Sequence, residues 1–283
     1  MKASQFEGIP PLPRDTARAA EAAFGKGNIY LTIGDHFKQL LTEIDFDRLV
    51  ATSPQSVSTL AVYALVTIFQ FVEGLPDRRA GEAIRTRTDW KYALHLSLAN
   101  PGLDHLTLCR FRQLVLSDPA VREVFQQMIR GLTQLGFLRD AFGQNAVSGE
   151  ILAAVCARSR LEQLIEVMRA ALESLAAVNP KWLVANTLPH WYERYNQQLA
   201  FDVLPGTIDA QNSLALSIGQ DARHLLEAVL LDDELAQLPE VQALQRSWPQ
   251  QFNRDQSEIE WRMPVCTSCL AYDRSANDLA HHS

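Results

Sequence analysis

The most apolar stretch of the chain runs from Ser58 to Glu73. Apolar side chains occupy almost every turn of this stretch, and a helix that is apolar all round must be covered on every side. Its apolar core, residues 60–72, is interrupted by Thr67 and Gln70 and is shorter than the roughly 20 residues that a membrane span needs. The pattern therefore predicts the central core helix of a first domain, and we expect no contact with a membrane.

A second apolar pattern lies in residues 148–178, where apolar residues follow one another at steps of four, three, four and three. The positions are Leu161, Ile165, Met168, Leu172 and Leu175. This spacing predicts one long helix with a short heptad seam. Two heptads are few for a coiled-coil dimer, so we expect the seam to pack within the chain. Association with another chain through the seam is the alternative.

Shorter patterns predict further helices and few strands. Residues 35–50 repeat apolar side chains at helical spacing, and further helices are expected from Asp77, over 89–98, and from Asp104 to about Leu116. Asp77 and Asp104 are candidate N-caps, and Asn100-Pro101-Gly102 forces a turn. Beyond Pro180 come aromatic anchors and a helical, acidic stretch over 209–238, with residues 201–204 as the only plausible strand.

These patterns predict a mainly α protein with a multi-helical bundle. The 283 residues can form one large core or two ordinary ones. Residues 1–30 are punctuated by Pro and Gly and are expected to form an N-terminal arm. Residues 31–140 would form a helical domain with a helix-turn-helix-like part, and residues 141–283 a helical, partly irregular region.

Charge is distributed unevenly along the chain. Counted from Pro76 to Arg139, ten Arg or Lys residues face six acidic residues, a formal charge of about +4 in a chain whose total is -7. A local basic segment in an acidic protein suggests an anionic partner, with nucleic acid as the first candidate. A solvated helix face with mixed charges is the alternative reading.

The turn at residues 100–102 and the helix after it have the layout of a helix-turn-helix motif. Thr107, Arg110 and Gln113 are three residues apart and share one helix face. The apolar side is expected to use Leu106, Cys109, Phe111 and Leu114. Many helical bundles contain such a pair of helices, so the pattern alone leaves DNA binding and simple packing open.

Other chemistry is sparse. The sequence has no Gly-rich phosphate loop and no Ser nucleophile elbow. Four cysteines without a secretory leader predict a reduced, cytoplasmic location. Cys266 and Cys269, with His281 and His282, have the residue types of a zinc site; a free thiol pair is the alternative.

Four short motifs, in order, resemble the N-terminal domain of bacterial insertion-sequence transposases of the DDE type. They begin at Leu75 (LPDRRAGEA), Asp89 (DWKYAL), Asn100 (NPGLD) and Leu108 (LCRFR). The resemblance continues through residues 150–175, 180–183, 191–195, 248–252 and 261–262, and so covers roughly residues 55–275.

The resemblance implies DNA binding at the terminal inverted repeats of a mobile element. It also implies a ribonuclease-H-like domain in which three carboxylates hold two Mg²⁺ ions. Val147 stands where the first catalytic Asp is expected, and a valine cannot ligate a metal. The other two carboxylates would follow a stretch that resembles residues 272–274, and the chain ends at Ser283. We therefore expect this chain alone to be catalytically inactive and to need no cofactor.

The leading hypothesis is a catalytically incomplete, transposase-like protein that binds double-stranded DNA. Its expected phosphate contacts are Arg78, Arg79, Arg85, Arg87 and Lys91, and its expected groove or backbone contacts are Thr107, Arg110 and Arg112. A homo-oligomer or an intact transposase is a possible partner. The alternatives are a helical interaction protein or relic that does not bind DNA, and the first part of a split or frameshifted active transposase.

Overall fold

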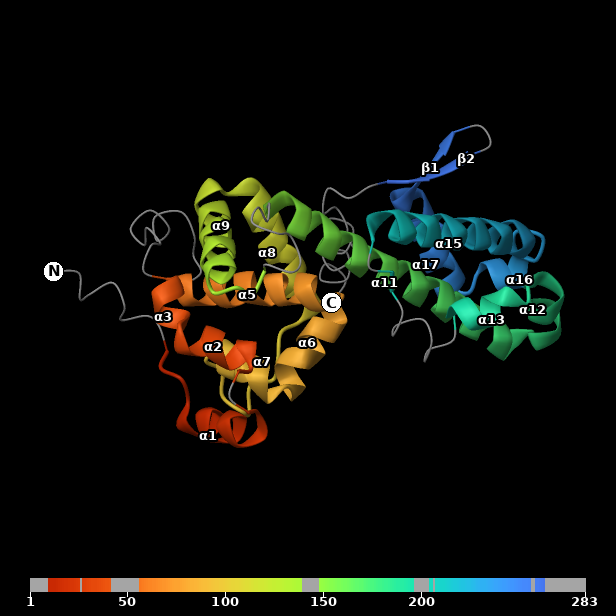
Figure 1. Cartoon of the computed structure of the whole chain (residues 1–283). Coiled ribbons are helices and arrows are strands. Elements are labelled where there is room, and N and C mark those ends of the chain that lie inside the picture. The colour runs from red at the N-terminus through yellow and green to blue at the C-terminus, as the bar shows by residue number, and fades with distance from the viewer. Residues whose placement is uncertain are drawn as a thin grey trace, which may run out of the picture. The chain divides into compact units, whose positions relative to one another are not determined.

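The computed structural model describes residues 10–25, 27–41, 56–138, 148–195, 204–205, 207–255 and 258–262. Within these residues the chain is helical apart from one two-stranded antiparallel hairpin (Figure 1). The prediction of a mainly α, multi-helical protein is confirmed. No single helix in the described part has the length and apolar character to cross a bilayer. The bent pair of helices Ser58–Glu73 and Asp77–Thr86 is together long and apolar enough, by length and composition only.

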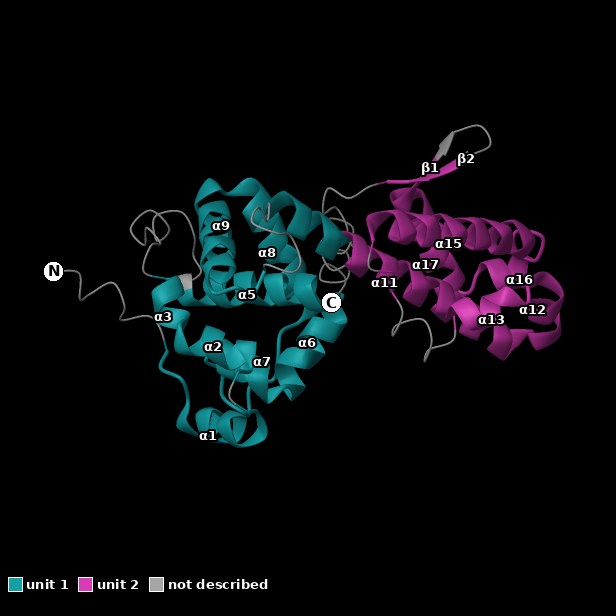
Figure 2. Cartoon of the chain, viewed as in Figure 1, with its two compact units in different colours: residues 1–156, 266–283 teal, residues 157–265 magenta. Residues whose placement is uncertain are grey.

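The chain divides into two compact units (Figure 2). Unit 1 comprises residues 1–156 and 266–283, and unit 2 comprises residues 157–265. The boundary falls inside the long helix α11, Ser148–Val178, so that its first turns belong to unit 1 and the remainder to unit 2.

Unit 1 is built from short and medium helices around one core. Before α11 they are α1 (Arg14–Ala23), α2 (Ile29–Asp35), α3 (Phe37–Leu40), α5 (Val57–Glu73), α6 (Asp77–Thr86), α7 (Thr88–Ala93), α8 (His105–Ser117) and α9 (Pro119–Gln134). The central helix is α5, which packs against α6, α8 and α9. Its side chains Leu60, Leu65 and Phe69 are fully buried, as the apolar run predicted.

The expected N-terminal arm is instead partly helical. Helix α1 packs against α7, and the buried Thr16 donates a hydrogen bond from Oγ1 to the Leu96 carbonyl, 2.9 Å away. Asn28 caps α2 by accepting from the backbone N–H groups of Tyr30 and Leu31. Of the helix predicted over 35–50, residues 37–40 form α3, which follows α2 after His36, and residues 42–50 lie outside the described residues.

Close backbone packing fixes the start of α8 against α6. A Cβ on Gly81 would lie 2.5 Å from the Leu103 carbonyl oxygen, and one on Gly102 would lie 2.7 Å from the Gly81 carbonyl oxygen. Gly102 also has a φ of 90°, which favours glycine. The predicted third helix ends early, at Ala93, so residues 94–104 separate α7 from α8. That connection is longer than the turn of about 3–4 residues in a helix-turn-helix.

Unit 2 has its own core. After α11 its elements are α12 (Pro180–Asn186), α13 (His190–Tyr195), α15 (Ile208–Val229), α16 (Asp233–Ala236), α17 (Pro239–Gln251), β1 (Phe252–Asp255) and β2 (Glu258–Trp261). The predicted long helix is confirmed as α11. Its seam packs inside this core, where Leu161, Met168 and Leu175 are fully buried. The expectation that the seam packs within the chain is therefore confirmed.

The hairpin is an element that the apolar pattern did not predict. Its register pairs Phe252 with Trp261, and both side chains are buried in the unit 2 core. Trp191 is buried there too. These aromatic side chains supply a large share of the apolar area that this unit removes from water. Of the strand expected over 201–204, residues 201–203 lie outside the described residues.

Candidate nucleic-acid interface

The cations of residues 76–138 divide into buried and exposed groups, and Arg112 is the most buried of them. Its side chain is 1% exposed, and its Nη1 and Nη2 donate to the two carboxylate oxygens of Asp77 at 2.7 and 2.6 Å. Gln70 Nε2 donates to the same carboxylate at 2.9 Å. Asp77 is the first residue of α6 and follows the N-cap residue, Pro76. Asp77 therefore does not cap α6 as predicted, but accepts hydrogen bonds from Arg112. Arg112 points inward, where the sequence suggested a contact with DNA.

The position of Arg112 follows from the buried face of α8. Its neighbours on that face are Leu108, Phe111 and Val115, at the helical spacing of a single stripe. Of the predicted apolar side, Cys109 and Phe111 are buried, whereas Leu106 and Leu114 are only half-buried. The helical spacing of residues 108, 111, 112 and 115 can be read from the sequence. The ion pair of Arg112 cannot, because its partner Asp77 lies 35 residues away in the chain.

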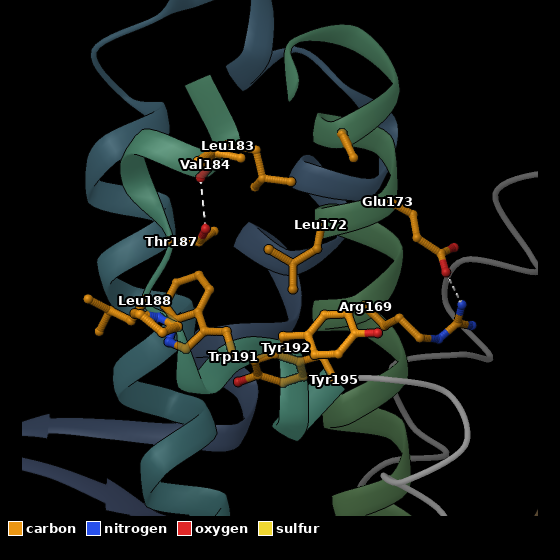
Figure 3. Close-up of a pocket in the computed structure, with 12 residues that line it drawn as sticks. Arg169, Leu172, Glu173, Leu183, Val184, Thr187, Leu188, Trp191, Tyr192 and Tyr195 are labelled. Carbon is orange, nitrogen blue, oxygen red and sulfur yellow. Dashed lines mark hydrogen bonds and ion pairs between the residues drawn. The ribbon is translucent and has the colours of Figure 1, made fainter. Parts of the chain in front are cut away.

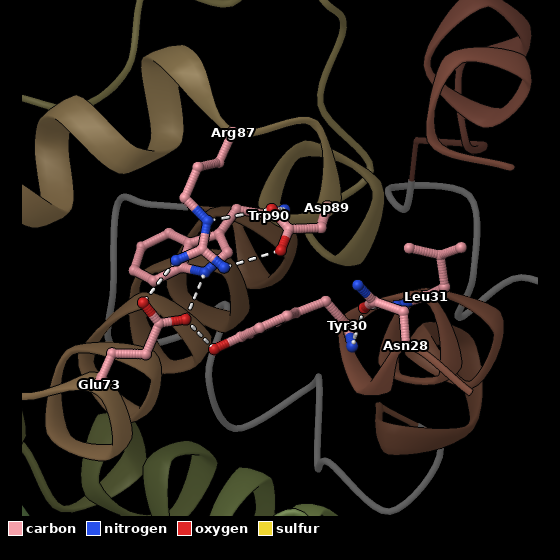
Figure 4. A network of polar contacts seen from close by, with 7 residues as sticks. All are labelled: Asn28, Tyr30, Leu31, Glu73, Arg87, Asp89 and Trp90. Atoms are coloured by element: carbon pink, nitrogen blue, oxygen red, sulfur yellow. Dashed lines mark hydrogen bonds and ion pairs between the residues drawn. The ribbon is translucent and has the colours of Figure 1, made fainter. Parts of the chain in front are cut away.

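Arg87 is held in a polar network between α5, α2 and α7 (Figure 4). Its Nη1 lies 2.5 Å from Glu73 and its Nη2 lies 2.7 Å from Asp89. The guanidinium also lies over the rings of Tyr30 and Trp90, at 5.2 and 5.1 Å from their centroids. Arg87, which the sequence suggested as a phosphate contact, is therefore in contact with four side chains and joins the helices that carry them.

The same network shifts two pKa values. Burial lowers the pKa of Arg87, but hydrogen bonds to Asp89 and Glu73 outweigh it and raise that pKa above its usual value. Burial, followed by the hydrogen bond that its hydroxyl donates to Glu73, raises the pKa of Tyr30. Both groups therefore keep their ordinary protonation state over the physiological range.

Lys91 is also turned inward. Its side chain is buried, and Nζ donates to the carbonyl of Leu98 and, at 3.3 Å, to that of Asn100. These two carbonyls belong to the connection that precedes α8. Lys91 therefore fixes this turn, where the sequence suggested a phosphate contact.

The remaining predicted cations lie on the outer faces of α6 and α8. Arg78, Arg79 and Arg85 are exposed on α6, and Arg110 is exposed on α8. Glu82 stands among the arginines of α6, 3.6 Å from Arg79 and 3.9 Å from Arg85. Because α6 and α8 pack together, the structure brings four of the eight predicted residues to the surface of one helix pair. Thr107 is half-buried.

Two exposed arginines of α9 were not selected from the sequence. Arg122 donates from Nε to the Val115 carbonyl at 3.0 Å and from Nη2 to the Leu116 carbonyl, so it caps the end of α8. Arg130 lies 2.7 Å from Glu123. The apolar period of α9 is enough to predict that both arginines lie on its outer side. The contact of Arg122 with the preceding helix cannot be predicted in this way.

Unit 2 contains a cavity of about 730 Å³ that opens to the surface (Figure 3). Apolar and aromatic side chains form most of its wall, among them Leu172, Leu183, Trp191 and Tyr195. Arg169 lies at one side, where it contacts Glu166 at 3.0 Å and Glu173 at 2.5 Å. The paired charges leave the wall without a strong net charge of either sign.

Metal-binding and catalytic residues considered from the sequence fall largely outside the described part. Val147, Cys266, Cys269, His281 and His282 all lie there. In the described ranges, no group of three or more His, Cys, Asp or Glu side chains is placed to hold a metal ion.

Comparison with protein families places these helices in a known context. Residues 21–114 match the family model of a transposase domain (DUF772). Neither the search of curated proteins nor the search of solved structures finds a match. The matched segment runs from within α1 to within α8 and contains both Asp77 and Arg112. Over these residues, the N-terminal region of this chain is therefore similar to a transposase domain.

Proposed function

We propose that this chain is a DNA-binding, transposase-like protein that recognises the terminal inverted repeats of a mobile element through unit 1. The observation that carries the proposal is the set of exposed arginines on α6 and α8, within a segment that matches a transposase domain. Exposed arginines suit this role because their planar guanidinium groups bind phosphate oxygens bidentately.

In this proposal the exposed and buried cations have separate tasks. Arg78, Arg79 and Arg85 contact phosphates, which gives affinity and a salt dependence but no sequence information. Arg110, at the outer face of α8, approaches base edges in a groove. The buried pair of Asp77 and Arg112 holds α8 against α6, and so sets the spacing of the two contact faces.

We further propose that this chain does not cleave DNA. The resemblance to DDE transposases implies three carboxylates that hold Mg²⁺, and it puts Val147 at the position of the first, where the side chain has no oxygen to donate. A valine at that position does not fit a site in which three carboxylates hold two metal ions, and this misfit supports the proposal.

The test of DNA binding is a mobility-shift titration of a duplex that carries the inverted repeat, at rising salt. We expect binding at low salt that weakens as salt rises, and about a 5- to 100-fold loss of affinity for Arg110→Ala if it reads a base. A duplex of scrambled sequence serves as the control.

Arg112→Ala is not a test of DNA contact, because it breaks a buried ion pair. Arg85→Ala is the matched variant on α6, and it should weaken binding to both duplexes equally. The proposal is overturned if neither duplex binds at low salt, or if Arg85→Ala and Arg110→Ala both bind like the parent chain.

A further inference from the structure

An acidic residue stands at the centre of the exposed face of α6. Glu82 follows Arg78 by four residues and Arg79 by three, and it precedes Arg85 by three. Residues three and four apart are neighbours on a helix surface, so Glu82 borders all three arginines. The inner face of the same helix holds Ala80, Ala83 and Ile84, and so the acid is not needed for packing.

The contacts of Glu82 are long and exposed. One carboxylate oxygen lies 3.6 Å from Arg79 Nη1, and the other lies 3.9 Å from Arg85 Nη2. The side chains of Glu82, Arg79 and Arg85 are 50%, 43% and 62% exposed. Exposed ion pairs of this kind contribute little to stability, so an arriving anion can replace the carboxylate at small cost to the fold.

The buried pair on the other side of α6 provides the contrast. Arg112 contacts Asp77 at 2.6 Å with 1% exposure, in the geometry of a strong bidentate pair. A short, buried arginine–carboxylate pair therefore occurs where two helices of the fold pack together. At Glu82 it holds one carboxylate loosely between two arginines.

We propose that Glu82 is an internal competitor of the DNA phosphate: it occupies Arg79 and Arg85 in the free chain and is displaced when a phosphate binds there. This inference rests on the proposed function of α6 as a phosphate-binding face. Glu82 lowers the affinity for DNA in two ways, because it neutralises part of the arginine charge and repels the approaching phosphates.

The test is the Glu82→Gln variant, which keeps the size of the side chain and removes its charge. At about 50 mM salt we expect its affinity for duplex DNA to rise about twofold, the effect of one unit charge about 7 Å from a phosphate in water when salt screens it over a Debye length of about 14 Å. The slope of log affinity against log salt should steepen by up to about 0.9, the contribution of one further phosphate contact.

Two variants separate this mechanism from a general charge effect. Glu82→Asp keeps the charge, so its affinity for duplex DNA should stay close to that of the parent chain and below that of Glu82→Gln. Glu227→Gln makes the same change of total charge in unit 2, where Glu227 lies 2.9 Å from Arg223, and should bind DNA like the parent chain.

The outcomes distinguish the inference from the function on which it rests. If the parent chain and all variants fail to bind DNA, the proposed function fails. If the parent chain binds and Glu82→Gln has the same affinity and salt slope, the function stands and the competitor role of Glu82 is overturned. A gain that Glu227→Gln reproduces would also overturn it.

Discussion

The inner and outer sides of α6 present arginine–carboxylate pairs of opposite kinds. On the inner side, Asp77 receives two short hydrogen bonds from Arg112, and the pair is nearly closed to water. On the outer side, Glu82 lies at longer distances from Arg79 and Arg85, in the open. Buried pairs are costly to break and exposed pairs are not. The inner pair therefore maintains the fold, whereas the outer ion pairs contribute little to it.

Unit 2 shows that inward-facing arginines are not a property of the transposase domain alone. Arg160 is buried, and its Nε donates to Gln251 Oε1 at 2.8 Å. Asp221, also buried, accepts hydrogen bonds from Arg194 and, at 2.7 Å, from the Tyr195 hydroxyl. A count of basic residues along a helical chain therefore overestimates the cations that a nucleic acid can reach.

The largest expected effect comes from breaking the inner pair. Arg112→Ala leaves the Asp77 carboxylate buried without its cation, and it should lower the free energy of unfolding by about 3–5 kcal/mol. Arg110→Ala, two residues away on the exposed face, should change it by no more than about 0.5 kcal/mol. Urea unfolding followed by circular dichroism measures both, and equal effects would contradict the division into inner and outer arginines.

A smaller effect is expected where α6 meets the start of α8. Gly81→Ala places a Cβ 2.5 Å from the Leu103 carbonyl oxygen, a backbone atom that cannot turn aside. Such overpacking should cost about 1–3 kcal/mol. Gly149→Ala on α11 is the matched control, because no atom lies within 4 Å of its added Cβ. The same unfolding assay should show no loss for the control, and a loss there as large as for Gly81→Ala would refute the steric explanation.

A third effect should appear only at high pH. Burial, aided by the hydrogen bond that its hydroxyl donates to Asp35 at 2.7 Å, raises the pKa of Tyr92 to about 12. An unfolded tyrosine has a pKa of about 10. The contribution of Tyr92 to stability is thus complete below about pH 10 and is lost as the pH rises through about 12. Unfolding measured from pH 9 to 12 should show a shallower decline for Tyr92→Phe, and an unchanged decline would contradict the assignment.

Two of the three longest described helices, α5 and α11, were predictable from the sequence because their signal is local. The continuous apolar run gave α5, and the seam from Leu161 to Leu175 gave α11. The hairpin was missed because its strands are only four residues each and follow a helix that contains Pro249. Helix α1 was missed because the surrounding Pro and Gly residues suggested an irregular segment.

The candidate interface was predictable as a segment but not residue by residue. The basic composition located α6 and α8, and the exposed positions of Arg78, Arg79, Arg85 and Arg110 agree with helical spacing. The inward positions of Arg87, Arg112 and Lys91 depend on partners such as Glu73, Asp77 and the Leu98 carbonyl. Contacts between separate helices, or with the carbonyl groups of a turn, produce no periodic pattern in the sequence. The inward positions of these cations could therefore not be predicted from it.

The most direct test of the central claim is the salt dependence of duplex binding by the parent chain and by a variant with Arg78, Arg79 and Arg85 all changed to Ala. If these outer arginines bind phosphates, the variant should keep its helical circular dichroism spectrum, and its slope of log affinity against log salt should be shallower by about 2 to 3, close to 0.9 for each lost phosphate contact. An unchanged slope with the fold intact would contradict the claim that the outer face of α6 binds DNA.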